Sequence, residues 1–230
     1  NKIKIKIDRE LLKYLREFDR QYRVSRISPV LSQRINDFIL AEGKRIRPIL
    51  FIISYLGFSR KPDPGIYRSA LSLELLHDFL LAHDDIIDKS DTRRGRPSMH
   101  ASFNAFLSRY KKIKFNGQDL AIVAADIIYA MSVSAFLSVK EPARRKESAL
   151  KKILDAAIYT EIGEFIELVQ GANDIAKITL KDIYKIYDYK TAIYSFSVPL
   201  AAGAILSGAD KSEVDKLFRY GIYLGRAFQI

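Results

Sequence analysis

The sequence predicts an all-α protein, and three observations support this prediction. Apolar residues recur at the spacing of amphipathic helices over almost all of the 230 residues. Runs that alternate apolar and polar residues, as half-buried strands do, are scarce after residue 7. The breaks between the periodic segments are short and carry turn residues, as in "RKPDPG", "RRGRP", "FNGQ" and "GAND". We expect helices at residues 8–20, 28–41, 47–57, 66–91, 101–108, 119–138, 144–171, 180–206 and 211–230.

The first seven residues allow two structures. Lysine and isoleucine alternate in "NKIKIKI", so this segment either pairs as a strand or only leads into the helix after Asp8. It lacks the continuous apolar region of a signal peptide. We therefore expect no targeting segment and a cytoplasmic protein.

One predicted helix is long enough to span a bilayer. Residues 120–139 read "LAIVAADIIYAMSVSAFLSV" and carry a single charge, at Asp126. A carboxylate in the middle of a bilayer is costly. We therefore expect a fully buried helix of a large soluble bundle and no transmembrane span.

The chain is predicted to form one domain over residues 1–230. Its hydrophobic residues, 48% of the total, are enough for a substantial core, and no break has the length or polarity of an interdomain linker. The last predicted helix shows no stop signal at Ile230. We therefore expect the natural protein to continue beyond this residue.

Composition excludes several kinds of site. The chain has no cysteine, which excludes disulfides and thiolate metal ligands, and only three histidines, which argues against an imidazole-rich metal site. The formal net charge of +11 suits a nucleic acid, a membrane surface or a phosphorylated substrate as partner. Because the cations are scattered and form no motif that reads RNA or DNA, we expect no nucleic-acid partner.

An acidic cluster ends the apolar run in "LLHDFLLAHDDIIDKSDTRRGRPSMH", residues 75–100. On a helix, Asp84 and Asp88 lie one turn apart on the same side, and Asp85 points elsewhere. His77 lies two turns before Asp84, near the same side. Two carboxylates at this spacing suit Mg²⁺, which takes hard oxygen ligands and completes its shell with water and substrate phosphate. A solvated helix end is the alternative, although the long apolar approach argues against it.

Two groups of cations accompany this cluster. A glycine and a proline stop the helix, so Arg93 and Arg94 fall in a turn that can fold back toward the acids. Arginine binds phosphate oxygens bidentately, so the acids, through magnesium, and the arginines, directly, can hold the same polyanion. Earlier in the chain, "AEGKRIRPIL" contains Lys44 and Arg47, which indicate either a second phosphate site or a surface patch.

Five segments match, in order, the motifs of one enzyme family. They are "GKRIRP" (43–48) for GKRxRP, "HDDIIDKSDTRRGRPSMH" (83–100) for the first aspartate-rich motif with RRGxPxxH, "GEFIEL" (163–168) for GQxxDL, "YKTAIYSFSVP" (189–199) for the KT segment, and "LGRAFQI" (224–230) for the approach to the second aspartate-rich motif. The chain thus resembles the trans-prenyl (polyprenyl) diphosphate synthases. Its pattern is closest to archaeal-type short-chain geranylgeranyl diphosphate synthases.

This resemblance implies a fold, a reaction and a set of site residues. The fold would be a single large helical bundle of the isoprenoid synthase type around a central apolar cavity, usually as a homodimer. The reaction would join isopentenyl diphosphate head to tail with dimethylallyl, geranyl or farnesyl diphosphate, with Mg²⁺ assisting ionisation. Carried over by motif, Asp84 and Asp88 would bind the metal, Arg93, Lys190, Thr191 and Gln229 the allylic diphosphate, and Lys44, Arg47, His77 and Arg94 isopentenyl diphosphate.

The resemblance also bears on product length. In this family the residues just before the first aspartate-rich motif form the pocket floor. Phe79 occupies the fifth position before Asp84, and Leu80 follows it. An aromatic residue at the first of these positions is typical of archaeal-type geranylgeranyl synthases, so we expect a product of twenty carbons. A farnesyl or longer-chain polyprenyl product is the alternative, as is a structural role of Phe79 in core packing.

The chain departs from the family pattern at three places. Ala125 stands where glycine is usual, and Glu164 and Glu167 replace the usual Gln and Asp of GQxxDL. The second aspartate-rich motif should begin immediately after Ile230, so the 230 residues alone are expected to be inactive.

Three other functions remain as alternatives. "AHDDIID" contains a His83–Asp84 dyad like that of HD-type metal phosphohydrolases, but His77 and His100 are the only further histidines. A non-catalytic partner subunit of a synthase is possible, although the intact first motif argues against it. A terpene cyclase is disfavoured, because it does not need the second diphosphate site that Lys44 and Arg47 would supply.

Overall fold

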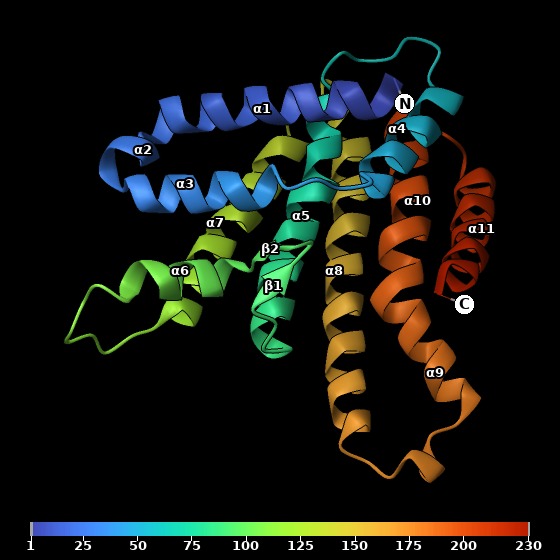
Figure 1. The fold of residues 1–230 in the computed structure, drawn as a ribbon. Helices are drawn as coiled ribbons and strands as arrows, with labels where there is room; N and C mark the ends of the chain where they lie inside the picture. The colour runs from blue at the N-terminus through green and yellow to red at the C-terminus, as the bar shows by residue number, and fades with distance from the viewer. Residues whose placement is uncertain (1, 230) are drawn as a thin grey trace. The chain divides into compact units, whose positions relative to one another are not determined.

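The computed structural model describes residues 2–229, which are mostly helical (Figure 1). The all-α prediction is confirmed. The helices are α1 (Lys2–Tyr22), α2 (Val24–Ile27), α3 (Pro29–Ile39), α4 (Ile46–Phe58), α5 (Ile66–Ile87), α6 (Met99–Leu107), α7 (Gly117–Phe136), α8 (Ala143–Gly171), α9 (Leu180–Ile186), α10 (Val198–Ser207) and α11 (Lys211–Gln229). The other elements are the strands β1 (Thr92–Arg93) and β2 (Arg96–Pro97), the 3₁₀ turn η1 (Ile175–Lys177) and the π-helix η2 (Tyr187–Ser197).

The amino-terminal segment is helical, so the strand alternative is wrong. α1 begins well before Asp8, because Ile3, Ile7 and Leu11 repeat every four residues and the last two are fully buried. Lys4 also pairs with Asp8 one turn later, at 2.8 Å between Nζ and Oδ2. Helical spacing therefore prevails over the period-two alternation of lysine and isoleucine.

The helix predicted over residues 66–91 ends earlier. α5 stops at Ile87, and Lys89 has a left-handed backbone with φ 53°. β1 and β2 follow as an antiparallel hairpin. Arg94 and Gly95 at its turn have φ of 53° and 74°, the geometry of a tight two-residue hairpin turn. Periodicity could not predict these strands, because each has only two residues.

The helix predicted over residues 180–206 consists of three consecutive parts. α9 passes into η2, which passes into α10. Lys190 and Thr191 lie in η2, and π-helical turns occur frequently at functional sites. Hydrophobic spacing does not distinguish a π-helix from an α-helix over so few turns, so the sequence could not predict this change.

The described residues form two compact units. Unit 1 comprises the chain up to Arg45 together with Tyr67–Ser138. Unit 2 comprises Ile46–Ile66 together with the chain from Val139 onward. The expectation of one prenyl synthase domain over residues 1–230 stays a prediction.

In unit 1, α7 packs one of its faces into the core. By length and composition alone it could cross a membrane. However, the Tyr14 hydroxyl donates to the Met131 carbonyl at 2.8 Å, and the Ser132 hydroxyl donates to the Ser72 carbonyl at 3.0 Å. Asp126 lies on the other face and is exposed. α7 is therefore a core helix, but the prediction that it is fully buried is wrong, because Ile122, Val123 and Asp126 on its other side are exposed.

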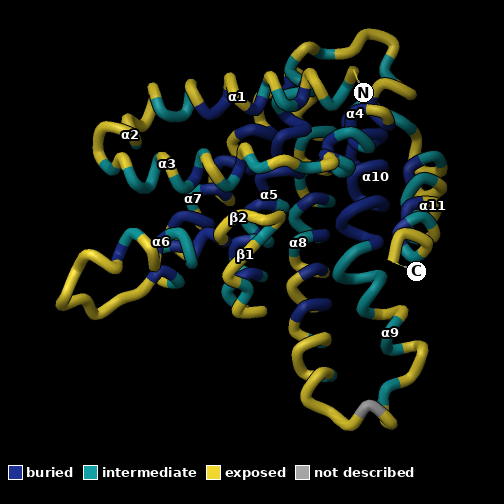
Figure 2. The backbone as a smooth tube through the Cα atoms, viewed as in Figure 1, coloured by how far each residue is buried: buried dark blue, intermediate teal, exposed yellow. Residues whose placement is uncertain are grey.

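In unit 2, α10 packs closely against α4. Figure 2 shows α10 buried along most of its length. A Cβ at Gly203 would lie 2.3 Å from the Phe51 carbonyl oxygen, so glycine permits this approach. The Ser54 hydroxyl also donates to the Leu200 carbonyl at 2.6 Å. This contact anchors the segment that continues directly from η2.

Candidate active site

The acidic end of α5 presents two carboxylates to solvent. The Asp88 backbone N–H donates to the Asp84 carbonyl at 2.8 Å, so the two residues lie one helical turn apart as predicted. Asp84 is half-buried and Asp88 is exposed. Within residues 2–229, no group of three or more acidic or histidine side chains is placed to hold a metal ion. Two oxygen donors at this spacing nevertheless fit Mg²⁺, which usually takes one or two carboxylates and completes its shell with water and phosphate oxygens.

The hairpin folds back onto the acids, as predicted. Arg93 Nε donates to Asp85 Oδ1 at 2.8 Å, and Arg93 Nη2 lies 2.6 Å from the same oxygen. Arg93 Nη2 also lies 3.2 Å from Asp84 Oδ2. Burial lowers the pKa of Arg93, but the two carboxylates outweigh burial and raise it. The guanidinium is therefore permanently charged beside the proposed metal ligands.

Asp85 is a site residue that the sequence interpretation missed. Its side chain is only 1% exposed, and its Oδ1 contacts both Nε and Nη2 of Arg93. The available signal was the pair of adjacent aspartates. Because adjacent residues of a helix point in different directions, one carboxylate can face the proposed metal while its neighbour holds an arginine.

Arg94 lies against the loop that carries Lys44. Its Nη1 donates to the Glu42 carbonyl at 2.5 Å, and a Cβ at Gly43 would lie 3.0 Å from the same nitrogen. Unit 1 therefore brings Arg94 close to the loop of Lys44, and both residues are predicted to bind isopentenyl diphosphate. His77 lies half-buried on α5.

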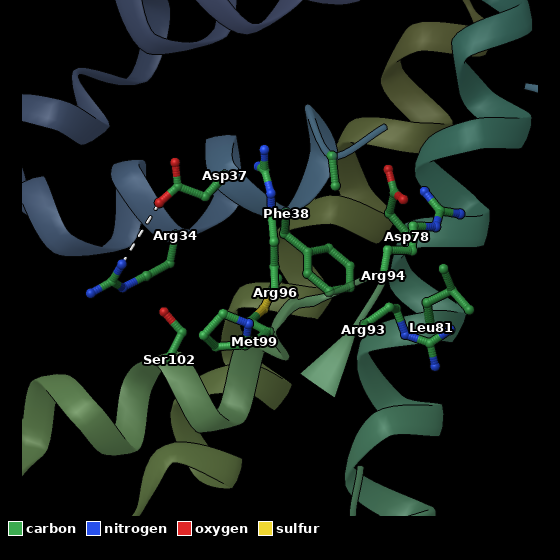
Figure 3. Close-up of a pocket in the computed structure, with 12 residues that line it drawn as sticks. Arg34, Asp37, Phe38, Asp78, Leu81, Arg93, Arg94, Arg96, Met99 and Ser102 are labelled. Carbon is green, nitrogen blue, oxygen red and sulfur yellow. Dashed lines mark ion pairs between the residues drawn. The ribbon is translucent and has the colours of Figure 1, made fainter. Parts of the chain in front are cut away.

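A cavity of about 310 Å³ lies beside the hairpin (Figure 3). Its wall combines cationic and apolar side chains from α3, α5, the hairpin and α6. The ion pair between Arg34 and Asp37, at 3.7 Å, lies on its α3 side. The lining residues are Arg34, Asp37, Phe38, Ala41, Asp78, Leu81, Arg93, Arg94, Arg96, Pro97, Met99 and Ser102.

In unit 2, η2 holds Lys190 between two carboxylates of α8. Lys190 Nζ lies 2.6 Å from Glu164 Oε2 and 2.5 Å from Glu167 Oε2. Burial lowers the pKa of Lys190, but both glutamates raise it, and the net shift is upward. A Cβ at Gly163 would lie 2.9 Å from the Lys190 backbone nitrogen, so α8 and η2 are in close contact here. The two departures from GQxxDL are therefore the direct partners of this lysine.

The carboxyl-terminal helix reaches the same segment. Gln229 Nε2 donates to Thr191 Oγ1. Arg226 donates through Nε and Nη2 to the Asp188 carboxylate, at 2.7 Å and 2.6 Å. This two-point contact fastens α11 to η2. Lys190, Thr191 and Gln229, all predicted for the allylic diphosphate, thus lie on two elements that contact each other.

Arg47 is also held against η2. Its Nη2 donates to the Ser195 hydroxyl at 2.7 Å, and its guanidinium lies 4.6 Å from the centre of the Tyr194 ring. Neither partner was predicted. The predicted binding residues therefore fall into two groups: Lys44, His77, Asp84, Asp88, Arg93 and Arg94 in unit 1, and Arg47, Lys190, Thr191 and Gln229 in unit 2.

Phe79 lies in an aromatic contact on α5. Its ring centre is 4.7 Å from that of His83 and 5.2 Å from that of Tyr129 on α7. Leu80 is buried, at 8% exposure. Ala125, which replaces the usual glycine, is fully buried in α7.

The histidines are dispersed within the described residues. His83 Nδ1 lies 3.1 Å from the Phe79 carbonyl oxygen, and His100 Nδ1 lies 3.2 Å from the Ser98 hydroxyl. His100 Nε2 lies 3.5 Å from Asp91 Oδ1. The phosphohydrolase alternative needs histidines gathered around a metal, and residues 2–229 offer no such group.

Comparison with known proteins decides the family. Residues 28–230 match the family model described as Polyprenyl synthetase. The chain belongs to the polyprenyl synthetase family. The chain is 30% identical over 205 residues to the geranylfarnesyl diphosphate synthase of Natronomonas pharaonis, covering 83% of this chain and 55% of the relative. It is 30% identical over 232 residues to the short chain isoprenyl diphosphate synthase of Methanocaldococcus jannaschii, covering 98% of this chain and 60% of the relative.

Solved structures show the same fold. The geranylgeranyl pyrophosphate synthase of Corynebacterium glutamicum, complexed with isoprenyl diphosphate and magnesium, has a TM-score of 0.83 at 27% identity, covering 100% of this chain and 66% of that protein. The geranylgeranyl pyrophosphate synthetase of the archaeon Geoglobus acetivorans has a TM-score of 0.81 at 24% identity, covering 99% of this chain and 66% of that protein. The predicted isoprenoid synthase fold is confirmed. The chain spans about 55–60% of the length of the two curated relatives named above.

Proposed function

We propose that the protein is a prenyltransferase that condenses isopentenyl diphosphate head to tail with an allylic diphosphate. The observation that carries this proposal is the hairpin after α5, which brings Arg93 to Asp84 and Asp85 and Arg94 to the loop of Lys44. Guanidinium groups suit phosphate oxygens, and two carboxylates one helical turn apart suit Mg²⁺. Membership of the polyprenyl synthetase family supports the same reaction.

The site residues divide between the two substrates in this proposal. Asp84 and Asp88 would hold Mg²⁺, which would neutralise charge on the allylic diphosphate. The other predicted residues would contact the two diphosphate groups directly. Arg93, Lys190, Thr191 and Gln229 contact the allylic diphosphate, and Lys44, Arg47, His77 and Arg94 bind isopentenyl diphosphate.

The reaction follows from where charge develops. The bond between C1 of the allylic substrate and its diphosphate oxygen breaks, and the electron pair leaves with the diphosphate. Arg93 and Lys190 stabilise this departing anion by charge-assisted hydrogen bonds. The double bond of isopentenyl diphosphate attacks the allylic cation, a carbon–carbon bond forms, and the released diphosphate takes the proton that is lost.

The cation itself needs stabilisation that does not react with it. The Thr191 hydroxyl, whose partner is Gln229, supplies a dipole of this kind on η2. Apolar side chains must exclude water, since water would quench the cation. Phe79 and Leu80 belong to such an apolar run on α5.

A twenty-carbon product fits Phe79 at the fifth position before Asp84. Its ring is backed by Tyr129, which supports a role as pocket floor. The names of the relatives cover short-chain, geranylgeranyl and geranylfarnesyl synthases. A farnesyl or longer product therefore remains the alternative for this chain.

We also propose that the protein acts as a homodimer in the cytoplasm. Apolar side chains on the outer face of α7 support self-association, since Ile122, Val123 and Tyr129 are 40%, 57% and 37% exposed. Sedimentation equilibrium of the full-length protein tests this proposal. A dimer that Val123→Glu dissociates is the expected result, and a monomer at all concentrations would contradict it.

Product chromatography tests the proposed function. The full-length protein is incubated with isopentenyl diphosphate, Mg²⁺ and, in separate reactions, dimethylallyl, geranyl or farnesyl diphosphate. Extension of the starters to geranylgeranyl diphosphate is the expected result. Absence of any extended product from a folded protein would contradict the proposal and favour the non-catalytic partner subunit.

A further inference from the structure

The loop between α3 and α4 contains an arginine that the proposed chemistry does not use. Arg45 has a left-handed backbone with φ 54°, which costs free energy in a residue other than glycine. Its side chain is only 4% exposed, although arginine is rarely buried without partners. The next residue toward the amino terminus, Lys44, is exposed. The two neighbouring cations thus have opposite environments.

The Arg45 guanidinium connects three elements of unit 1. Nη1 donates to Glu74 Oε1 of α5 at 2.6 Å, and Nε donates to Asp8 Oδ1 of α1 at 3.1 Å. Nη2 donates to the carbonyl oxygens of Ile39 and Ala41 at 3.4 Å and 3.2 Å. The last two contacts close the loop onto the end of α3. The backbone between Ala41 and Arg45 is therefore fixed at both of its ends.

Gly43 lies between Arg45 and Arg94. A Cβ at Gly43 would be 3.0 Å from Arg94 Nη1 and 3.2 Å from Arg45 Nη1. Arg94 also donates to the Glu42 carbonyl at 2.5 Å. The loop is thus held by Arg45 on its buried side and by Arg94 on the side of the hairpin.

We infer that Arg45 is a positioning residue for isopentenyl diphosphate binding. Its contacts keep the loop in the conformation that exposes Lys44 and contacts Arg94, so that both cations can reach the same phosphate group. Because the loop is already ordered, binding does not incur the entropic cost of ordering it. This inference rests on the proposed function. It assigns to Arg45 and its partner Glu74 an effect on one substrate and not on the other.

The test removes the buried ion pair as a unit. Arg45→Met alone would leave the Glu74 carboxylate buried and uncompensated, whereas Arg45→Met/Glu74→Leu removes both charges and preserves volume. The control is Arg68→Met/Glu10→Leu, since Arg68 Nε also joins α1 to α5, at 2.6 Å from Glu10, but does not contact the loop. Circular dichroism and thermal melting establish that each full-length variant is folded.

Calorimetric titration with isopentenyl diphosphate then measures Kd for each protein, and steady-state assays measure KM for both substrates. We expect Arg45→Met/Glu74→Leu to raise Kd for isopentenyl diphosphate about tenfold or more, while its KM for the allylic substrate stays within about twofold of wild type. In the control variant, Kd for isopentenyl diphosphate and KM for the allylic substrate should both stay within about twofold of wild type. Lys44→Ala measures how much affinity for isopentenyl diphosphate is lost when the loop cation itself is removed. If the pair variant does not fold, Arg45→Lys replaces it, because lysine keeps the charge but cannot bond both carbonyl groups.

The outcomes separate the inference from the function on which it rests. An unchanged Kd in a folded Arg45 variant, with Lys44→Ala weakened, would overturn the inference and leave the function intact. Equal losses for both substrates would also overturn it, because they would show only general loosening. A wild-type protein that does not bind isopentenyl diphosphate would overturn the proposed function and the inference together.

Discussion

Arg93 lies 2.6 Å from the buried carboxylate of Asp85, whereas the more exposed Asp84 is 3.2 Å from the same guanidinium nitrogen. The two adjacent aspartates therefore have different environments, because the Asp85 side chain is 1% exposed and that of Asp84 is 25% exposed. We expect this difference to separate their roles, with Asp85 positioning Arg93 and Asp84 acting as the proposed metal ligand.

Asp84→Asn and Asp85→Asn should have different kinetic effects. Removing a proposed metal ligand at Asp84 should lower kcat/KM by about 10²–10³-fold and raise the Mg²⁺ concentration needed for half-maximal rate. Asp85→Asn should raise KM for the allylic diphosphate, because Arg93 loses its closest anionic partner, but leave the Mg²⁺ requirement unchanged. Magnesium titrations of both variants provide the measurement. Identical Mg²⁺ dependence of the two variants would refute the division of roles.

Glu164→Gln should improve binding of the allylic diphosphate. Lys190 is held by two carboxylates, and a diphosphate must compete with both for its three donors. With one carboxylate neutralised, KM for the allylic substrate should fall by about threefold to tenfold, or about 0.7–1.4 kcal/mol. Glu213→Gln is the control, since Glu213 pairs with Lys216 on the exposed side of α11. An unchanged KM in Glu164→Gln would exclude this competition.

Phe79→Ala should lengthen the product. The ring rests against Tyr129 and His83, so its removal should open space beneath the allylic chain. Chromatography of the products should then show prenyl chains beyond twenty carbons. Leu80→Phe is the reciprocal variant, and the added ring should shorten the product toward fifteen carbons. Unchanged product length in Phe79→Ala would leave the residue with core packing as its only role.

Gly203→Ala should destabilise unit 2. The new Cβ would lie 2.3 Å from the Phe51 carbonyl oxygen and 3.0 Å from the Tyr55 nitrogen, so α10 and α4 would have to separate. Overpacking of this kind costs about 1–3 kcal/mol. Gly57→Ala on α4 is the matched control, because nothing lies within 4 Å of its Cβ position and alanine favours the helix. Urea denaturation of both variants should show a loss for the first and no loss for the second.

The sequence predicts the helices well because their apolar residues are periodic over many turns. It fails where structure depends on contacts from elsewhere in the chain. The two-residue strands carry no period of their own. The π-helical stretch around Lys190 packs closely against Gly163 and is bonded to α11, contacts that no local sequence pattern indicates. The amino-terminal alternation misleads because burial of Ile7 and Leu11 decides the local structure.

The site residues show the same limit. Motif order predicts Asp84, Arg93 and Lys190 as site residues, because each carries a chemical group that suits phosphate or magnesium. Asp85 and Glu74 are buried acids of α5. The position next to Asp84 was the only sequence signal for Asp85, and nothing around Glu74 distinguishes it from the acids that face solvent. They become recognisable only when an arginine from another element meets them.

Release of inorganic diphosphate by the full-length protein tests the central claim most directly. We predict one diphosphate released for each isopentenyl diphosphate consumed, only when an allylic diphosphate and Mg²⁺ are both present, with release abolished by a chelator. Diphosphate or phosphate release from a single substrate, or no release with both substrates and Mg²⁺ present, would contradict the account.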